Sequence, residues 1–237
     1  MSPLIDAVGV THQRIQPGEP CRIVSLVPSV TELLCALGLA PQLVGRTGFC
    51  IHPNEALATI QKIGGTKDVN IGKIRQLAPT HLVVNIDENE KPTVEALARF
   101  VPNVIVTHPL APEDNLTLYQ LLGGIFARDN EAESLCAHFR AALQAVHELP
   151  AQPAHRVLYC IWQDPWMTVS RDTYIARMLS LIGWQQWRSD SEARYPVFRW
   201  GEPMLTEIDE IVLSSEPYRF TQAHADALEK QTGQPVR

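Results

Sequence analysis

The segment from Arg22 to Cys50 constrains the fold of this chain more than any other stretch. It begins with a short apolar run rich in β-branched residues, Arg22–Leu26, which is typical of a buried strand. Pro28 ends this run, and leucines at helical spacing then predict a helix that ends at Gly38. A second apolar run, Leu43–Val44, follows. This order is a βαβ unit, whose parallel strands require a sheet covered by helices.

The start of the predicted helix and the ends of the two strands locate a candidate binding site. Ser29 precedes Glu32 by three residues, which is the spacing of a capping box, so we expect Ser29 to be the helix N-cap. In open α/β sheets, ligands bind beyond the carboxyl ends of the strands. Pro28–Ser29 and Gly45–His52 are therefore expected at the mouth of a site.

Strand and helix patterns continue to alternate along the chain. In the first half we expect strands at His81–Asn85 and Asn103–Thr107, and helices at Asn70–Leu77 and Lys91–Phe100. This alternation describes one doubly wound lobe. A second series follows, with strands and helices expected at Arg156–Ile161, Trp166–Ser170, Asp172–Leu181, Glu210–Ser214 and Gln222–Gln231.

Between the two series lies a helical stretch. We expect one helix over Glu113–Phe126, interrupted near Gly123–Gly124, and a long uninterrupted helix over Glu131–Leu149. The sequence therefore predicts an α/β fold in which two lobes with mainly parallel sheets are joined by a single long helix. We expect residues 1–112 to form the N-terminal lobe, 113–152 the connecting helices with the long backbone helix, and 153–237 the C-terminal lobe.

Composition excludes several classes of partner. The formal net charge is −6 and no basic patch stands out, which argues against nucleic acid and against anionic membrane surfaces. No apolar run approaches the roughly 20 residues that span a bilayer. The five cysteines are odd in number and contain no CxxC pair, so a disulfide framework is not expected. We expect a monomer.

The sequence is compatible with more than one cellular location. The first twenty residues lack the charged start and apolar block of a secretory signal, so the protein is either cytoplasmic or has lost a signal segment. Free thiols fit a reducing compartment slightly better than an oxidising one.

All five tryptophans lie in the predicted second lobe, at positions 162, 166, 184, 187 and 200. Tryptophan commonly fills cores, and this is the simpler interpretation for each of them. Trp162 and Trp166, however, follow the strand Arg156–Ile161 at its carboxyl end. That position favours an aromatic wall for a large flat ligand.

Several sequence blocks resemble the helical-backbone class, or class III, of ABC-transporter substrate-binding proteins, and within it the cobalamin-binding proteins. The resemblance runs from Ile5 to about Leu213 and is carried by IDAVG with CRIVSLVPSVTELLCALGL, by VGRTGFCIHP, by IQKIGGTKDVNIGKIRQLAPTHLVVN, and by RVLYCIWQDPWMT, YIARMLSLIGW and WGEPMLTEIDEIVL. It implies two α/β lobes on one rigid helix, with the ligand held between them, and a periplasmic or other extracytoplasmic location. Relatives continue past the position of Arg237 into another strand and helix, so some family contacts fall outside this sequence if the chain continues likewise.

The resemblance also implies contact residues. Matched onto this chain, the family's ligand loops fall at Pro28–Ser29, Phe49–Cys50, Gly65–Thr66, Asn85–Ile86 and Ile161–Trp166. The family docks onto its permease through one surface acid on each lobe. Glu202 matches the second-lobe acid, whereas Gly72 stands where the first-lobe acid is expected, and this departure weakens the case for docking.

Cys50 and His52 form a Cys-x-His pair in a loop beside Pro53. Structural zinc requires four such ligands, so the pair is a weak zinc signal. His52 alone suits an axial position on a corrin cobalt. The simpler interpretation, which we favour, is a buried Cys50 and a loop histidine.

No GxSxG, HExxH or phosphate-loop motif occurs, so the sequence predicts a binding protein without catalytic residues or intrinsic cofactor. Its ligand is expected to be a metal chelate, most closely a corrinoid such as cobalamin, delivered to an ABC importer. Flat aromatic surfaces with a few placed polar groups suit such a ligand. The expected contact residues are Pro28, Ser29, Phe49, Cys50, His52, Thr66, Asn85, Ile86, Trp162 and Trp166.

Two alternatives remain. The first is an iron–siderophore or haem carrier. Siderophore chelates are often anionic, which would require Arg46, Arg171 or Arg199 to face the ligand. The second, from another class, is a cytoplasmic metal-handling protein or enzyme that uses Cys50 and His52, although catalytic partners usually come from distant segments.

Overall fold

The computed structural model describes residues 3–150, 152–189, 191–216 and 218–237. The chain divides into two compact units. Unit 1 comprises Met1–Pro109 and Asp114–Arg140, and unit 2 comprises Leu110–Glu113 and Ala141–Arg237. The predicted division treats residues 113–152 as separate connecting helices. In the structure, Asp114–Arg140 belongs to unit 1, and the rest of that stretch belongs to unit 2.

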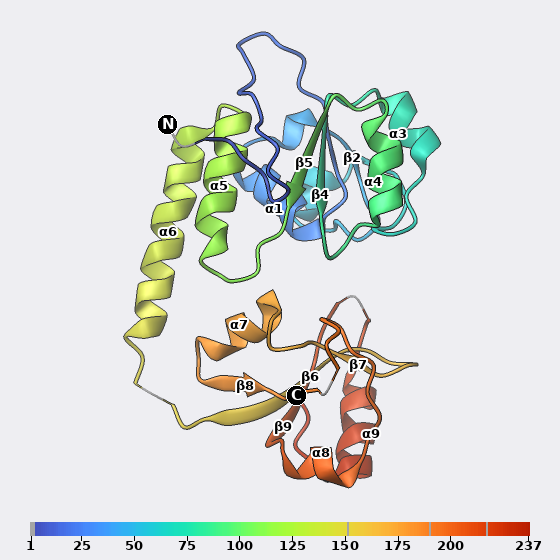
Figure 1. Cartoon of the computed structure of the whole chain (residues 1–237), viewed down its shortest axis with the longest axis vertical. Helices are drawn as coiled ribbons and strands as arrows, with labels where there is room; N and C mark the ends of the chain where they lie inside the picture. The colour runs from blue at the N-terminus through green and yellow to red at the C-terminus, as the bar shows by residue number, and fades with distance from the viewer. Residues whose placement is uncertain (1–2, 151, 190, 217) are drawn as a thin grey trace. The chain divides into compact units, whose positions relative to one another are not determined.

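Unit 1 is built on a five-stranded sheet in the order β3-β2-β1-β4-β5, and every pair of neighbouring strands is parallel. Figure 1 labels β2, β4 and β5 of this sheet together with helices of unit 1. The strands are β1 (Ile23–Ser25), β2 (Leu43–Arg46), β3 (Gln61–Lys62), β4 (His81–Asn85) and β5 (Asn103–Thr107). The sequence predicts β4 and β5 to the residue. It misses β3, because this strand has only two residues, both exposed and polar.

Helices cover both faces of this sheet, and the alternation of side chains along the strands decides which residues they meet. Ile23 and Val83 pack on one face in a core shared with α1, α5 and the start of α6. Val24, Leu82 and Val84 point to the opposite face, in a core shared with α3 and α4. The helices of unit 1 are α1 (Pro28–Ala36), the 3₁₀ turn η1 (Ala40–Gln42), α2 (Asn54–Leu57), α3 (Ile71–Leu77), α4 (Lys91–Ala98), α5 (Asp114–Ile125) and the first part of α6 (Asp129–His147).

The first helix does not begin with the predicted capping box. Its N-cap is Val27, which has extended backbone angles, and no side chain caps the helix. Pro28 takes the first helical position, where its fixed φ and missing N–H suit the helix. Ser29 is thereby placed inside the first turn, with its side chain exposed.

Helix α5 is not interrupted near Gly123–Gly124, where the sequence predicts a break. A Cβ at Gly123 would lie 2.4 Å from the Cβ of Ala132 on α6, and a Cβ at Gly124 would lie 2.4 Å from Cδ2 of Leu4. Since α5 runs on to Ile125, the two glycines let neighbouring segments approach closely and do not break the helix.

Unit 2 contains a four-stranded sheet with β6 (His155–Trp162) at its centre. Strands β8 (Trp184–Gln186) and β9 (Glu210–Leu213) run parallel to β6, and β7 (Met167–Thr168) runs antiparallel to it. Helix α7 (Tyr174–Ser180) lies beside β8, and α8 (Glu202–Thr206) and α9 (Gln222–Thr232) follow (Figure 1).

The predicted fold class, α/β with mainly parallel sheets, is confirmed. Within the described ranges, α6 with 19 residues is the longest helix. None of the described helices is both long and apolar enough to cross a membrane.

Candidate functional site

The order of strands in unit 1 creates a switch point between β1 and β4, which are neighbours in the sheet. The chain leaves β1 for α1 on one face and leaves β4 for α4 on the other face. In open α/β sheets a crevice at such a point, outside the carboxyl ends of the strands, is the usual ligand site. We call the loops that follow the five strands, residues 26–29, 47–53, 63–70, 86–90 and 108–109, the carboxyl edge.

Asn89 ties three of these loops together. Its side-chain Nδ2 donates to the carbonyl oxygen of Thr66 at 2.9 Å and to that of Leu26 at 3.4 Å. Its Oδ1 accepts from the backbone N–H of Asn85 at 2.9 Å. The side chain is buried, so it holds these loops together from the interior of unit 1. Sequence reasoning missed Asn89, because it lies in a polar stretch with no local pattern.

Large apolar side chains are exposed on two of the loops. Phe49, after β2, is 50% exposed, and Ile86, after β4, is 45% exposed. The Phe49 ring lies against Gly65, where an added Cβ would sit 3.4 Å from ring atom Cε2. The loops of β2 and β3 are also joined by a hydrogen bond from Gly48 N–H to the Gly64 carbonyl, 2.7 Å long. Phe49 and Ile86 thus offer apolar contact area on an ordered edge.

Cys50 and His52 occupy different environments. Cys50 is fully buried in the unit 1 core, with its Sγ 3.1 Å from Oγ1 of Thr31 and 3.1 Å from Oγ1 of Thr47. His52 is exposed. The expectation that Cys50 contacts a ligand is corrected by its burial, and the favoured interpretation of a buried thiol describes the structure. Among the residues described, no group of three or more potential ligands forms a metal centre.

The remaining predicted residues of unit 1 differ in accessibility. Ser29 is exposed, and Pro28 and Thr66 are half-buried. Asn85 is buried, its Nδ2 donates to Oγ1 of Thr107 at 3.4 Å, and its Oδ1 accepts from the N–H of Asp87 at 2.8 Å. Its amide therefore stabilises the turn after β4 and does not present a polar group to solvent.

The turn after β4 carries two acids next to the end of β5. Nε2 of His108 lies 3.4 Å from Oδ1 of Asp87, and both side chains are largely buried. Burial, and then repulsion from Asp87, raises the pKa of Glu88 to about 7. The charge of this turn therefore changes near neutral pH.

Arg46 is the one arginine that the sequence placed close to the carboxyl edge. It is buried, and its guanidinium faces inward. Nε and Nη2 donate to the carbonyl of Leu57 at 3.2 and 3.1 Å, and Nη1 donates to the carbonyls of Cys50 and Thr47 at 2.8 and 3.3 Å. Because these donors satisfy backbone acceptors, Arg46 holds the loop after β2 in place.

In unit 2, aromatic side chains gather at the carboxyl end of β6. Trp162 is 39% exposed and lies edge-on to Tyr218, with 5.3 Å between ring centroids. Tyr218 contacts Phe220 at 4.5 Å, and Phe220 stacks on Trp166 at 5.8 Å. We call these four residues the aromatic group. The sequence indicated Trp162 and Trp166 but not Tyr218 or Phe220, which lie more than fifty residues further along the chain.

Trp166 is less accessible than Trp162. It packs against Trp200 with 5.2 Å between centroids, in a core that also contains Phe198 and Trp187. The core interpretation therefore describes Trp166, Trp187 and Trp200, whereas Trp162 exposes its ring.

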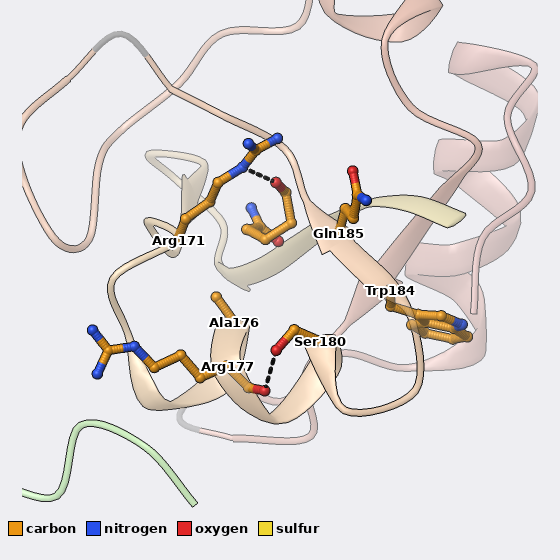
Figure 2. A pocket seen from close by; sticks show the side chains of 7 residues that line it. Arg171, Ala176, Arg177, Ser180, Trp184 and Gln185 are labelled. Atoms are coloured by element: carbon orange, nitrogen blue, oxygen red, sulfur yellow. Dashed lines mark hydrogen bonds between the residues drawn. The ribbon is translucent and has the colours of Figure 1, made fainter. Parts of the chain in front are cut away.

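A small cavity of about 160 Å³ lies in unit 2 between α7 and β8. Figure 2 shows the side chains that line it. Nε of Arg171 donates to the carbonyl of Gln186 at 2.8 Å beside it, while Arg177 pairs with Asp172. A second cavity, of about 340 Å³, lies at the amino end of β6 around His155. Both are lined by residues at or beside the amino end of β6, whereas Trp162 is the last residue of that strand.

The two predicted docking positions are both exposed. Glu202 is the first residue of α8, and Gly72 is the second residue of α3. A matching acid is thus present on unit 2 but is replaced by glycine on unit 1.

These features can be compared with known proteins. The family model of periplasmic binding proteins matches residues 23–232. This chain belongs to that family. The binding protein is therefore a non-enzymatic solute-binding component of ABC transport, which rules out the enzyme alternative built on Cys50 and His52.

Individual relatives of this binding protein are distant. A vitamin B12-binding protein of Pectobacterium carotovorum subsp. carotovorum (strain PC1) is 23% identical over 201 residues, covering 84% of this chain and 72% of the relative. The solved periplasmic vitamin B12 binding protein BtuF of Vibrio cholerae aligns with a TM-score of 0.75 at 22% identity, over 91% of this chain and 86% of that one. A periplasmic heme binding protein from Pseudomonas aeruginosa also gives 0.75 at 22% identity, over 91% and 78%. The fold is shared equally by proteins with these two ligands.

Proposed function

We propose that this binding protein holds a corrinoid such as cobalamin and presents it to the permease of an ABC importer. One observation carries the proposal: large apolar side chains are exposed at carboxyl strand ends in both units, Phe49 and Ile86 in unit 1 and Trp162 in unit 2. Flat aromatic surfaces of this kind suit a rigid macrocycle. The names of its distant relatives as vitamin B12-binding proteins support the same ligand.

Haem is the second candidate, because a heme binding protein shares the fold as closely as the B12 protein does. Haem is also a flat metal chelate, but its two propionates are anionic. The inward-facing Arg46 offers them no donor, since its guanidinium is occupied by backbone carbonyls. An anionic siderophore meets the same difficulty at this edge, and we therefore rank both behind the corrinoid.

For the permease, we propose Glu202 as a docking residue. Its exposure at the start of α8 leaves the carboxylate free to meet a basic side chain. Gly72 contributes no charge on α3, so docking by this protein depends more on Glu202 than the family pattern implies.

A direct titration tests the ligand. Purified protein is titrated with cyanocobalamin, haem and a ferric siderophore, and binding is followed by calorimetry and by tryptophan fluorescence, which reports on unit 2 because all five tryptophans lie there. We expect stoichiometric binding of cyanocobalamin and much weaker binding of the other two. Tight binding of haem or siderophore alone would replace the proposal, and binding of none of the three would reject it.

Variants connect the titration to the site. Phe49→Ala and Trp162→Ala each remove exposed contact area, and we expect each to weaken cyanocobalamin binding about tenfold or more, as truncated aromatic contacts at interfaces do. Leu149→Ala is a matched control, because Leu149 is 57% exposed and follows α6, outside the carboxyl edge and the aromatic group. An equal effect of all three variants would argue against these contacts.

A further inference from the structure

The charges of the carboxyl edge are unevenly distributed. Its loops contain four carboxylates, at Asp68, Asp87, Glu88 and Glu90, and one ammonium group, at Lys67. Its two histidines are His52 and His108. Whatever binds here therefore meets a negative surface around the exposed apolar side chains.

One acid of the turn after β4, Asp87, is held in place by its neighbours. The N–H of Asp87 donates to Oδ1 of Asn85, which is itself buried, and the Asp87 carboxylate lies beside the imidazole of His108. Glu88 is half-buried next to it. Because the Asp87 carboxylate lies beside His108 and is largely buried, it stays at the carboxyl edge when a charged ligand approaches, and its repulsion of an anion persists.

Arg46 does not offset these negative charges, because its guanidinium faces the interior of unit 1. All three guanidinium nitrogens of Arg46 donate to the carbonyls of Thr47, Cys50 or Leu57, and the residue is only 6% exposed. Recruiting it for a ligand carboxylate would leave those buried carbonyls without donors, which is costly.

We propose that Asp87 and Glu88, with Arg46 withheld in the interior, make the carboxyl edge select metal chelates whose periphery carries uncharged hydrogen-bond donors, such as carboxamides, over chelates whose periphery carries carboxylates. This inference rests on the proposed function and specifies the chemical class of its ligand. Carboxylates are acceptors only, so amide N–H groups match them whereas ligand carboxylates are repelled.

A pair of probes with the same corrin ring tests this selection. Dicyanocobinamide carries amides around the ring, and dicyanocobyrinic acid carries carboxylates at the corresponding positions. Calorimetric titration at pH 8.5, where Glu88 is ionised, and at moderate salt is expected to show at least thirtyfold tighter binding of the amide form. Equal or tighter binding of the acid form would overturn the inference and leave the proposed function standing, whereas binding of neither form would overturn both.

Isosteric variants assign the selection to these residues. Asp87→Asn with Glu88→Gln removes two charges, and we expect the affinity ratio of the two probes to fall at least fivefold because the acid form gains affinity. Glu95→Gln is the matched control, since Glu95 is an exposed acid on α4 outside the carboxyl edge. A ratio unchanged in the double variant would overturn the inference. Should the double variant fail to fold by circular dichroism, Glu88→Gln alone is expected to lower the ratio at least twofold, and an unchanged ratio in that single variant would likewise overturn the inference.

Discussion

The side-chain Nδ2 of Asn89 donates a hydrogen bond to the carbonyl oxygen of Thr66, 2.9 Å away, and so joins the loop after β4 to the loop after β3. The same nitrogen reaches the carbonyl of Leu26 after β1. Three loops that come from separate parts of the sequence are thereby fixed by one buried amide. This fixation is what gives the carboxyl edge of unit 1 a defined shape.

Replacing Asn89 should therefore loosen that edge. Asn89→Ala leaves the carbonyls of Thr66 and Leu26 without this donor, and we expect the free energy of unfolding to fall by about 1–3 kcal/mol. Asn89→Asp should cost at least as much, because it sets a carboxylate against two carbonyls. Urea unfolding measures the loss, and Asn130→Ala, at an exposed position of α6, serves as the control. Wild-type stability in both Asn89 variants would show that the amide is not needed.

The Cys50 thiol should resist alkylation in the folded protein. It is fully buried between the hydroxyls of Thr31 and Thr47, whereas Cys21 and Cys35 are partly exposed. Iodoacetamide followed by peptide mass spectrometry should modify Cys50 far more slowly than Cys21 under native conditions. Both should react fully in denaturant. Rapid native modification of Cys50 would mean that the loop after β2 opens readily.

The carboxylate of Asp6 organises the segment that precedes β1. It accepts hydrogen bonds from the N–H groups of Val8, Val10 and Val106 and lies 3.0 Å from Nε2 of His12. Burial acts in the opposite direction, but together these hydrogen bonds lower the pKa of Asp6. Its contribution to stability is therefore present above the unfolded value near 3.8 and is lost as the pH falls below it.

We expect Asp6→Ala to lower the free energy of unfolding by about 2 kcal/mol, because three part-buried backbone N–H groups and the buried His12 ring lose their common partner. Hydrogen exchange followed by mass spectrometry should show faster exchange over residues 4–12 and at Val106. Asp226→Ala, at an exposed position of α9, should change neither quantity. Unchanged exchange in the Asp6 variant would contradict the assignment.

Stability should also fall in mild acid through His81. This residue opens β4 and is buried, and burial, followed by repulsion from His12, lowers its pKa from 6.5 to about 4. The folded state therefore favours the neutral ring. Its contribution is complete above pH 6.5 and is lost as the pH falls from 6.5 towards 4, by at most about 3 kcal/mol.

His81→Gln should make this pH dependence shallower, since glutamine does not titrate. Denaturant unfolding at pH 7, 6, 5 and 4.5 gives the slope for both proteins. His138→Gln, an exposed histidine on α6, should retain the wild-type slope. Parallel slopes for wild type and His81→Gln would mean that His81 is protonated without cost in the folded protein.

Much of the fold follows from local patterns. The runs His81–Asn85 and Asn103–Thr107 are predicted as strands and match β4 and β5. Strands of a parallel sheet with covered faces leave continuous apolar runs, which a sequence displays directly. The short elements α2, β3, β8 and α8 lack such a signal, because an element of two to five residues cannot show a period.

The site is only partly predictable for a related reason. Phe49, Ile86 and Trp162 are placed by the resemblance, and the structure exposes all three. Cys50 belongs to the same set but is buried, because its sulfur meets Thr31, nineteen residues earlier. The resemblance locates a loop, and packing against other elements decides which of its side chains reach solvent.

Local sequence was enough to establish the α/β class and those strands of unit 1 whose side chains are buried. It also located the loops at which a ligand site is expected. Each of these results depends only on residues that are neighbours in the chain. Three-dimensional packing was needed to show that Arg46 faces inward, that Asn89 joins three loops and that Tyr218 and Phe220 accompany Trp162. The contacts of Asn89 and of the aromatic group join segments far apart in the chain, up to 63 residues for Asn89 and Leu26, whereas Arg46 reaches carbonyls that lie 1 to 11 residues further along. The hydrogen-bonding needs of buried backbone groups, and not any local pattern, select the positions of Arg46 and Asn89.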